Sequence, residues 1–346
     1  MQTQHGIPVW SSPAWLGAAT VWADETLAAQ GIRRTGRVTQ PHLRAWATAL
    51  VMPTTQGRVC LKATGPGTRF EVPLYTVLHR LVPTRTVEPL GIDMGRGWVL
   101  LRDGGAVLGT TEGSEGVTYA LPGIVGQYAQ LQLELTGHVD AVLGTGIPDH
   151  SPQRLPERLD EALDAGARYA ATAEEARMLR RVREQAPQVA ATAEYLSASD
   201  VRPTLQHDDL HPWNVFVTEP GERARFFDWG DSVVAHPFAT MLNLTRMVRE
   251  MLGTGADDPR ITRIRDAYLE PFGGPPASRV GELESACRVG GISRALAWTR
   301  VLDALGPAGA AEYRIAPLRW LSYLLVRDPY GGPGWGQGWE ASSASP

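Results

Sequence analysis

The sequence predicts an α+β fold, with strands concentrated in its first third and helices in most of the rest. Three patterns support this prediction. Residues 58–63 alternate apolar and polar side chains, as a half-buried strand does. From Ile124 to Val142, apolar residues recur at spacings of three and four, as on one face of a helix. Residues 215–227 contain two short apolar runs around a Pro-Gly turn, as in a β-hairpin.

The composition is that of an ordinary soluble globular protein. The 346 residues are 43% hydrophobic and 20% charged, and a chain of this length can build two lobes around a sizeable core. The net charge of −4 argues against nucleic acid as the main partner. Two cysteines provide no disulfide framework, so we expect a cytoplasmic location. The first residues do not resemble a signal peptide. The sequence has no run of about 18 apolar residues, so we expect no transmembrane helix and no membrane partner.

Capping and turn signals divide the first hundred residues. A helix that extends to about residue 30 is expected first, because Ser12 can cap it and Pro13 fits its first position. The elements expected next are two strands with a loop between them over 37–52, a turn over 53–57, a strand over 58–63, a helix over 70–81 and a strand over 98–101. Asp103-Gly104-Gly105 ends the last strand, and we expect the hinge between two lobes there.

After this hinge the chain is expected to be mostly helical. The apolar residues over 124–142 form one stripe that should pack in the core. Further helices are expected as two or three segments over 155–196, one that starts at Asp258-Pro259, and two over 280–305 and 312–326. Residues 331–346 form a tail that begins with a run of Gly, Pro and Trp.

The residues that carry chemistry lie around the predicted hairpin. The segment HDDLHPWN begins at His207, and FFDWGD ends at Asp231. Asn214 and Asp228 are equidistant from the turn, so antiparallel pairing is expected to bring them face to face. An amide oxygen and a carboxylate held together suit a hard cation such as Mg²⁺. Asp209 lies just upstream and is free to orient a nucleophile, which is the layout that phosphoryl transfer from a nucleotide needs.

A second observation concerns lysine. The chain has 33 lysines and arginines, and Lys62 is the one lysine among them. It lies near the end of the strand over 58–63. Ammonium and guanidinium groups are not interchangeable where a compact charge must fit against phosphate oxygens, so Lys62 is expected to bind phosphate. The alternative is that a surface lysine was retained by chance.

These segments resemble the aminoglycoside phosphotransferase family, the small-molecule branch of the protein-kinase-like fold. The family's catalytic segment typically reads His-Gly-Asp-Leu-His-Pro-x-Asn, and its metal segment reads Ile-Asp-Trp-x-Asp. The resemblance spans about 38–325, with specific motifs only in 60–71, 100–105 and 206–231. It implies a bilobal protein-kinase-like fold. The domains expected are a small β-rich N-lobe over 1–103, a larger and mostly helical C-lobe over 104–330, and the tail.

The resemblance also implies roles for five residues. Asp209 is the expected catalytic base, although an Asp there could instead bind loop amides. Asp228 is expected to bridge the metal and the β- and γ-phosphates, and Asn214 to hold a second coordination position. Glu71 is expected to pair with Lys62 and to aim it; the alternative is an exposed glutamate at a helix start.

The nucleotide base is expected near the hinge. Cys60 lies on the same strand face as Lys62, and this face should cover the base. Backbone groups of Leu101 and Asp103 are expected to form hydrogen bonds with the base.

The expected phosphate loop lacks the usual glycines. Residues 40–46 occupy its position and contain no glycine. Phosphate contacts are then expected from His42, Arg44 or backbone amides. ATP and GTP both remain possible as phosphoryl donors.

The chain departs from the family pattern at two positions. Asp208 replaces the usual glycine, and Trp213 occupies a variable position; neither change removes a catalytic group. His207 and His211 are expected to be structural. Asp231 is expected either in the outer shell of the metal or as a cap of the following turn.

We therefore predict a nucleotide-dependent O-phosphotransferase that transfers the γ-phosphate to a hydroxyl of a small molecule, with Mg²⁺ as cofactor. The most favoured acceptor is an antibiotic: an aminoglycoside, a nucleoside or another natural product. Acids in the C-terminal half are nearly balanced by arginines, which leaves room for an acceptor less cationic than an aminoglycoside. A monomer or a homodimer is expected.

Two rival hypotheses stay open, and a third is disfavoured. The first is a metabolic kinase for choline, homoserine or a sugar. The second is a non-catalytic, nucleotide-binding regulator, which would not need all four of Lys62, Asp209, Asn214 and Asp228. A protein kinase is disfavoured because the segment after Asp231 is too short for a long activation loop.

Overall fold

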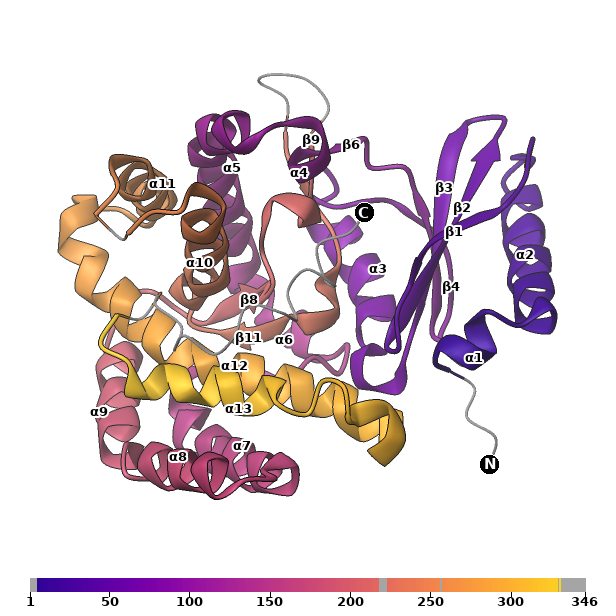
Figure 1. The fold of residues 1–346 in the computed structure, drawn as a ribbon. Coiled ribbons are helices and arrows are strands. Elements are labelled where there is room, and N and C mark those ends of the chain that lie inside the picture. The colour runs from indigo at the N-terminus through magenta and orange to yellow at the C-terminus, as the bar shows by residue number, and fades with distance from the viewer. Residues whose placement is uncertain (1–4, 218–222, 256, 329, 331–346) are drawn as a thin grey trace.

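A five-stranded antiparallel sheet lies beside a larger helical region (Figure 1). The computed structural model describes residues 5–217, 223–255, 257–328 and 330. The sheet order is β1-β2-β3-β5-β4. Its strands are β1 (Thr39–Leu43), β2 (Ala47–Thr54), β3 (Gly57–Thr64), β4 (Pro89–Asp93) and β5 (Trp98–Arg102). The predicted α+β class is confirmed.

The sheet separates an apolar core from the side that carries Lys62. Helix α2 (Pro13–Ala28) covers one face, and α3 (Glu71–Leu81) lies on the other (Figure 1). Because side chains alternate along a strand, Val59 and Leu61 of β3 pack in the core that α2 completes, and Lys62 points the opposite way. The period of the strand thus places the lysine toward α3 and the helical region.

The helical region is built mainly from helices that follow residue 113. These are α5 (Ser114–Leu135), α7 (Leu155–Tyr169), α8 (Ala173–Arg183), α9 (Ala186–Ser197), α10 (Met241–Leu252), α11 (Pro259–Leu269), α12 (Pro276–Ala310) and α13 (Ala316–Ser322). Shorter helices are α1 (Ile7–Trp10), α4 (Leu108–Thr111) and α6 (Val139–Leu143). Helix α12 extends from the far side of this region toward the sheet (Figure 1).

The capping predictions are confirmed, and the apolar stripe is divided. The Ser12 hydroxyl accepts a hydrogen bond from the Trp15 amide at 3.3 Å, and the Asp258 carboxylate accepts one from the Arg260 amide at 2.8 Å. The stripe over 124–142 belongs to α5 and α6, which a 3₁₀ turn over residues 136–138 separates. Both helices contribute to the same core, so the buried face is continuous although the helix is not.

The hairpin is present, but its register differs by one residue from the prediction. Strand β9 (Val215–Val217) pairs with β10 (Arg225–Phe226) and with β6 (Ala106–Val107). The Phe227 amide donates to the Asn214 carbonyl at 3.2 Å, so Phe227 rather than Asp228 lies opposite Asn214. The turn at residues 218–222, on which the prediction was centred, lies outside the described residues.

The third sheet is small and lies next to the catalytic segment. It consists of β7 (Asp149–His150), β11 (Val233–Ala235) and β8 (Thr204–Gln206), in that order. The short segment after Asp231, in which we expected no long activation loop, forms β11 before α10 begins.

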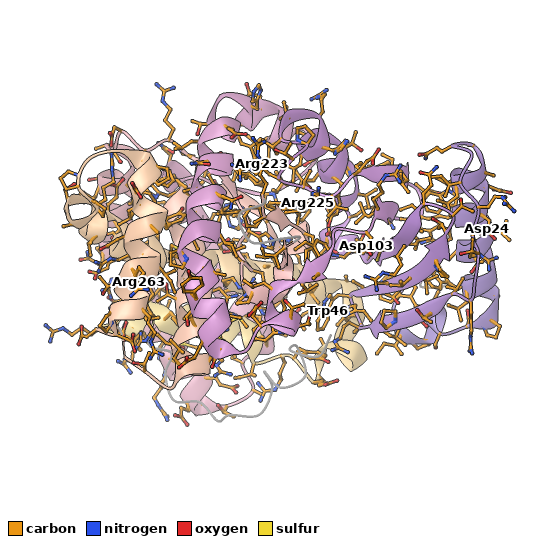
Figure 2. The ribbon with its side chains drawn as sticks, turned by 90° about the horizontal axis from the view of Figure 1, so that it is seen from above. Asp24, Trp46, Asp103, Arg223, Arg225 and Arg263 are labelled. Carbon is orange, nitrogen blue, oxygen red and sulfur yellow. The ribbon has the colours of Figure 1, made fainter. Side chains whose placement is uncertain are left out.

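The sheet and the helical region meet near Trp46 and near Asp103 (Figure 2). Figure 2 shows Trp46 and Asp103 near this junction, whereas Asp24 lies at the far edge on α2. Trp46, in the β1–β2 turn, packs edge-on against Trp298 of α12 and against Tyr313, with ring centroids 5.5 and 5.3 Å away.

The predicted domain boundary between residues 103 and 104 falls between β5 and β6 and stays a prediction. The tail over 331–346 lies outside the described residues. No helix in the described part of the chain is long and apolar enough to span a bilayer.

We expect Gly67→Ala to lower the free energy of unfolding by roughly 1–3 kcal/mol. A Cβ at Gly67 would lie 2.5 Å from the carbonyl oxygen of Arg300, so α12 would have to move away from the turn that carries this glycine. Gly17→Ala is the matched control, because no atom lies within 4 Å of its Cβ position and alanine favours the interior of α2. Urea unfolding of both variants measures the difference, and equal stabilities would contradict the packing argument.

Candidate active site

Lys62 joins three parts of the chain. Its Nζ lies 2.6 Å from Oε1 of Glu71 and 2.6 Å from Oδ1 of Asp228. The Trp229 amide donates to the same Glu71 oxygen at 3.0 Å. The expected pair between Lys62 and Glu71 is therefore present, and the direct contact with Asp228 was not predicted. These bonds connect β3, the start of α3 and the segment after β10.

Lys62 and Asp228 stabilise each other's charged form. Burial acts to lower the pKa of Lys62, but the two carboxylates outweigh burial and raise that pKa well above its usual value. Burial alone would raise the pKa of Asp228, but Lys62 lowers it below its usual value. Burial raises the pKa of Glu71 against the opposing effect of Lys62. At neutral pH the ammonium is therefore charged, and so is the Asp228 carboxylate.

Asp228 adopts a strained backbone conformation that directs its side chain. Its φ and ψ are 64° and 60°, which is the left-handed region that side chains other than glycine rarely adopt. The Asp228 amide donates to the Tyr75 hydroxyl at 3.1 Å, and this bond helps to hold the conformation. The carboxylate keeps 47% of its side-chain surface exposed. It can therefore bind an incoming ligand as well as Lys62.

Asp209 is held on one oxygen. Its Oδ1 accepts a hydrogen bond from Nδ2 of Asn243 at 2.9 Å and forms an ion pair with the guanidinium of Arg294 at 3.1 Å. Its Oδ2 lies 3.5 Å from Nε2 of His211. Burial would raise the pKa of Asp209, but Arg294 and His211 hold it well below its usual range. Asp209 is therefore charged and held in place, and its Oδ2 has fewer contacts than its Oδ1.

Asn214 lies beside the carbonyl of Asp209. Its Nδ2 donates to that carbonyl at 3.0 Å, so the side chain is anchored within the catalytic segment. The amide oxygen of Asn214 and the carboxylate of Asp228 are hard donors, which fit Mg²⁺ together with phosphate oxygens and water. The described residues include no group of three His, Cys, Asp or Glu side chains placed to hold a metal ion.

The structure explains the departure at Asp208. This residue also has a positive φ, 63°, which accounts for the glycine usual at this position in the family that the segment resembles. Aspartate tolerates this conformation better than most residues, and its carboxylate accepts from Nε2 of Gln206 at 2.7 Å and from Oγ of Ser293 at 2.8 Å. Burial raises the pKa of Asp208 to about 7, although Arg294 and Ser293 oppose this effect.

The remaining polar residues of the two segments have structural partners. The Nε2 of His207 lies 2.8 Å from the carbonyl of Phe227, as expected for a scaffold residue. Asp231 accepts from Arg294 at 2.7 Å. It is therefore engaged by α12, a partner that the sequence analysis did not consider, and Asn243 and Arg294 were also missed. No spacing rule connects residues on α10 or α12 to this segment.

The hinge differs in part from the expectation. Cys60 and Leu101 are partners in the β3–β5 register. The Asp103 amide donates to the carbonyl of Arg58 at 3.1 Å, so that amide is not available to a nucleotide base in this structure. The Asp103 carboxylate pairs with the Arg58 guanidinium at 2.8 Å. A contact with the base through the Asp103 carbonyl stays a prediction.

Two stacked aromatic rings beside the hinge were not predicted as part of the site. Phe216 and Phe227 have ring centroids 4.0 Å apart and planes 21° apart. A Cβ on Gly104 would lie 2.0 Å from the ring of Phe216, so the glycine lets this ring pack directly on the hinge. The motif placed Phe227 next to Asp228, but only the fold brings Phe216 against it.

The β1–β2 hairpin brings a histidine to the lysine face. His42 is opposite Ala49, which is opposite Lys62 in the register of the sheet. Burial lowers the pKa of His42, while Asp228 opposes this and Lys62 reinforces it. Arg44 lies in the turn, where its amide donates to the Ala47 carbonyl at 2.9 Å. Its contact with a nucleotide stays a prediction.

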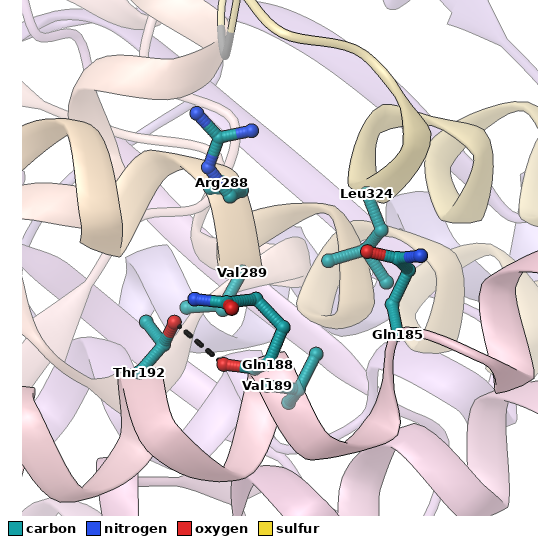
Figure 3. A pocket seen from close by; sticks show the side chains of 7 residues that line it. All are labelled: Gln185, Gln188, Val189, Thr192, Arg288, Val289 and Leu324. Carbon is teal, nitrogen blue, oxygen red and sulfur yellow. Dashed lines mark hydrogen bonds between the residues drawn. The ribbon is translucent and has the colours of Figure 1, made fainter.

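A separate hollow of about 310 Å³ lies between α9, α12 and Leu324 (Figure 3). Gln188, whose carbonyl accepts from the Thr192 hydroxyl at 2.9 Å, and Arg288 are on its lining. None of the residues predicted for the site is among those that line it.

The phosphotransferase enzyme family matches residues 47–277, which is more than half of the chain and includes Lys62, Asp209 and Asp228. The chain belongs to the phosphotransferase enzyme family. It is a small-molecule phosphotransferase of the kinase type, and a nucleotide is the phosphoryl donor in such enzymes generally. No curated protein matches the sequence.

Solved structures of kinases resemble this phosphotransferase in fold. An ethanolamine kinase from Plasmodium vivax aligns with a TM-score of 0.60 at 12% identity, over 91% of this chain and 90% of that one. A macrolide 2′-phosphotransferase from Brachybacterium faecium aligns at 0.55 and 16% identity, over 85% and 97%. A choline/ethanolamine kinase family protein from Mesorhizobium loti aligns at 0.55 and 20%, over 89% and 98%. The expected kinase-like fold is confirmed.

We expect Lys62→Arg to reduce turnover by roughly 10²-fold, because a longer, forked guanidinium would misplace the phosphates. Arg58→Lys, on the same strand but exposed, is the matched control and should keep normal turnover. Nucleotide consumption measures both. Since the chain has one lysine side chain, a lysine-directed acylating reagent should label it, and nucleotide should protect it. Normal turnover in Lys62→Arg would exclude this role.

We expect Asp208→Asn to remove part of the pH dependence of stability. Between about pH 4 and pH 7 the unfolded chain loses the Asp208 proton while the folded chain keeps it, so stability falls as pH rises through this window. Asparagine does not titrate and accepts a positive φ. Urea unfolding from pH 5 to pH 7.5 should therefore show the variant gaining roughly 1–2 kcal/mol on the wild type. A difference that is constant with pH would contradict the raised pKa.

Proposed function

We propose that this phosphotransferase transfers the γ-phosphate of ATP or GTP to a hydroxyl of a small molecule, with Mg²⁺, and that the acceptor is an antibiotic less cationic than an aminoglycoside. The observation that carries the proposal is the placement of Asp209, Asn214 and the Lys62–Asp228 pair in one site. These are the groups that phosphoryl transfer needs for acceptor, metal and phosphate.

The metal and phosphate roles follow from the charges. Asp228 and Asn214 would hold Mg²⁺, which neutralises charge on the β- and γ-phosphates when bound. Lys62, which now bonds to Asp228, is placed to donate to phosphate oxygens, and Glu71 would keep it aimed. The exposed part of Asp228 leaves room for this exchange.

Asp209 would orient the acceptor. The acceptor oxygen attacks the γ-phosphorus, the bond from that phosphorus to the β–γ bridging oxygen breaks, and the nucleoside diphosphate leaves. The hydroxyl proton passes to Oδ2 of Asp209 and then to solvent. In a loose transition state this transfer occurs late, so a carboxylate with a lowered pKa suffices.

The nucleotide base would lie beside the hinge. Cys60 would cover one of its sides, and Leu101 and the Asp103 carbonyl would border its edge. The stacked rings of Phe216 and Phe227 offer a flat apolar surface next to it. His42 shares the face of Lys62 and is a further candidate for phosphate contact.

The surroundings of Asp209 favour an acceptor with less positive charge than an aminoglycoside. Asp209 and Asp231 are both paired with Arg294, and Glu250 is paired with Arg246. A polycationic aminoglycoside or choline would compete with these arginines for the same carboxylates. The fold resemblance to a macrolide phosphotransferase supports a natural-product acceptor. A metabolic kinase is the second candidate, since choline and ethanolamine kinases share the fold.

We expect Asp209→Asn to reduce turnover roughly 10²- to 10⁴-fold, because a positioned base is lost while the shape is kept. Asp160→Asn, with an exposed carboxylate, is the control and should have normal turnover. Mg-ATP and Mg-GTP consumption should be screened with macrolides, nucleosides, aminoglycosides and choline. Nucleotide binding without turnover on any acceptor would favour the non-catalytic regulator, and wild-type turnover in Asp209→Asn would exclude this base.

A further inference from the structure

Arg294 of α12 connects two loops that the reaction must keep in register. Its guanidinium reaches Oδ1 of Asp209 at 3.1 Å and Oδ2 of Asp231 at 2.7 Å. Asp209 belongs to the catalytic segment, and Asp231 follows the proposed metal ligand Asp228 by three residues. The side chain of Arg294 is only 6% exposed. One buried cation thus joins the acceptor side of the site to its metal side.

The contacts make the two oxygens of Asp209 unequal. Oδ1 accepts a hydrogen bond from Asn243 and forms an ion pair with Arg294, whereas the contact given for Oδ2 within the described residues is with Nε2 of His211, at 3.5 Å. We propose that Arg294 is a positioning residue for phosphoryl transfer: it holds Oδ1 of Asp209 so that Oδ2 meets the acceptor hydroxyl. The inference rests on the proposed function and adds a residue from outside the two motifs.

Arginine is suited to this position for a geometric reason. Its planar fork presents donors in different directions, so it holds two carboxylates at once, whereas an ammonium acts as a point charge. The Arg294 guanidinium also lies over the Trp320 ring, 5.1 Å from its centroid, which limits its freedom. The fixed cation therefore fixes the carboxylate that it binds.

The neighbouring residue of α12 reinforces the same alignment. Ser293 donates to Asp208 at 2.8 Å, so consecutive residues of the helix bind consecutive residues of the catalytic segment. Asp208 has a positive φ, and its carboxylate is anchored in α12 rather than pointing to solvent. This pairwise match sets both the position and the rotation of the segment that ends in Asp209.

The competing interpretation is that Arg294 only stabilises the packing of α12. Arg279 on the same helix provides a matched control, because it also bridges two carboxylates, Asp200 at 3.0 Å and Glu282 at 3.3 Å. Neither of these belongs to the site. A purely structural role predicts that loss of either arginine has similar consequences.

We expect Arg294→Gln to lower kcat for Mg-nucleotide consumption with the acceptor found in the screen by roughly 10- to 10²-fold. The KM for nucleotide should change less than about threefold, since Arg294 binds Asp231 and not the Lys62–Asp228 pair that would hold phosphate and metal. Arg294→Lys should recover part of kcat, because lysine can hold one of the two carboxylates. Arg279→Gln should keep kcat within about twofold of the wild type.

A double-variant cycle tests whether Arg294 acts through Asp209. In the Asp209→Asn background, Arg294→Gln should lower kcat by less than about threefold, because the carboxylate that it positions is gone. If the two losses multiply, or if Arg294→Gln and Arg279→Gln lower kcat equally, the positioning role is overturned. If Arg294→Gln does not fold, Asp231→Asn replaces it: a reduced kcat supports the inference, and an unchanged kcat contradicts it. Absence of turnover in the wild type would instead contradict the proposed function.

Discussion

The contact of Lys62 with the buried Glu71 and the half-exposed Asp228 is the interaction on which the site depends. It joins a strand of the sheet, the start of α3 and the segment after the hairpin. Removing charges from water costs several kcal/mol per ion unless each has a partner, so loss of one member leaves the others uncompensated. The sheet, α3 and the metal segment are thereby held in one relative position. A ligand that takes over Asp228 must also offer Lys62 a new anion, as phosphate does.

Both loops of the site contain an aspartate in the left-handed region. Asp208 and Asp228 have φ values of 63° and 64°, and such residues cost about 1–3 kcal/mol each and persist only where the surroundings hold them. The surroundings do so with Ser293 at the first position and with the Tyr75 hydroxyl at the second. The left-handed backbone conformation points each carboxylate in a direction that it would not have in a regular strand. This is how a hairpin with a one-residue shift still delivers Asp228 to Lys62.

Helix α12 organises the other side of the site. Ser293 and Arg294 bind the catalytic segment, and Trp298 packs against Trp46 of the β1–β2 turn. The turn that would cover the phosphates is therefore held by aromatic packing against the helical region, where a glycine-rich loop would rely on backbone flexibility. A turn that is fixed by packing does not need the flexibility of glycine, and the large ring of Trp46 provides the packing surface.

The sequence by itself determined the local structure and the main chemical groups. Capping residues marked the starts of α2 and α11, alternation marked β3, and one lysine near the end of that strand was associated with phosphate. These signals are readable because they depend on neighbours within a few residues. The spacing of Asp209, Asn214 and Asp228, with its resemblance to a known family, placed the expected chemistry in one segment.

Only the tertiary structure decided the partners of these groups. Arg294 and Asn243 lie on helices far along the chain, and nothing in local periodicity connects them to Asp209. The hairpin register differs by one residue from the prediction, and the positive φ that still brings Asp228 to Lys62 cannot be recognised from an aspartate in the sequence. Backbone groups of Asp103 were expected to bind a nucleotide base, but the amide of Asp103 donates to the carbonyl of Arg58. Contacts between distant segments follow from packing of the whole chain, and this packing is what the sequence patterns do not contain.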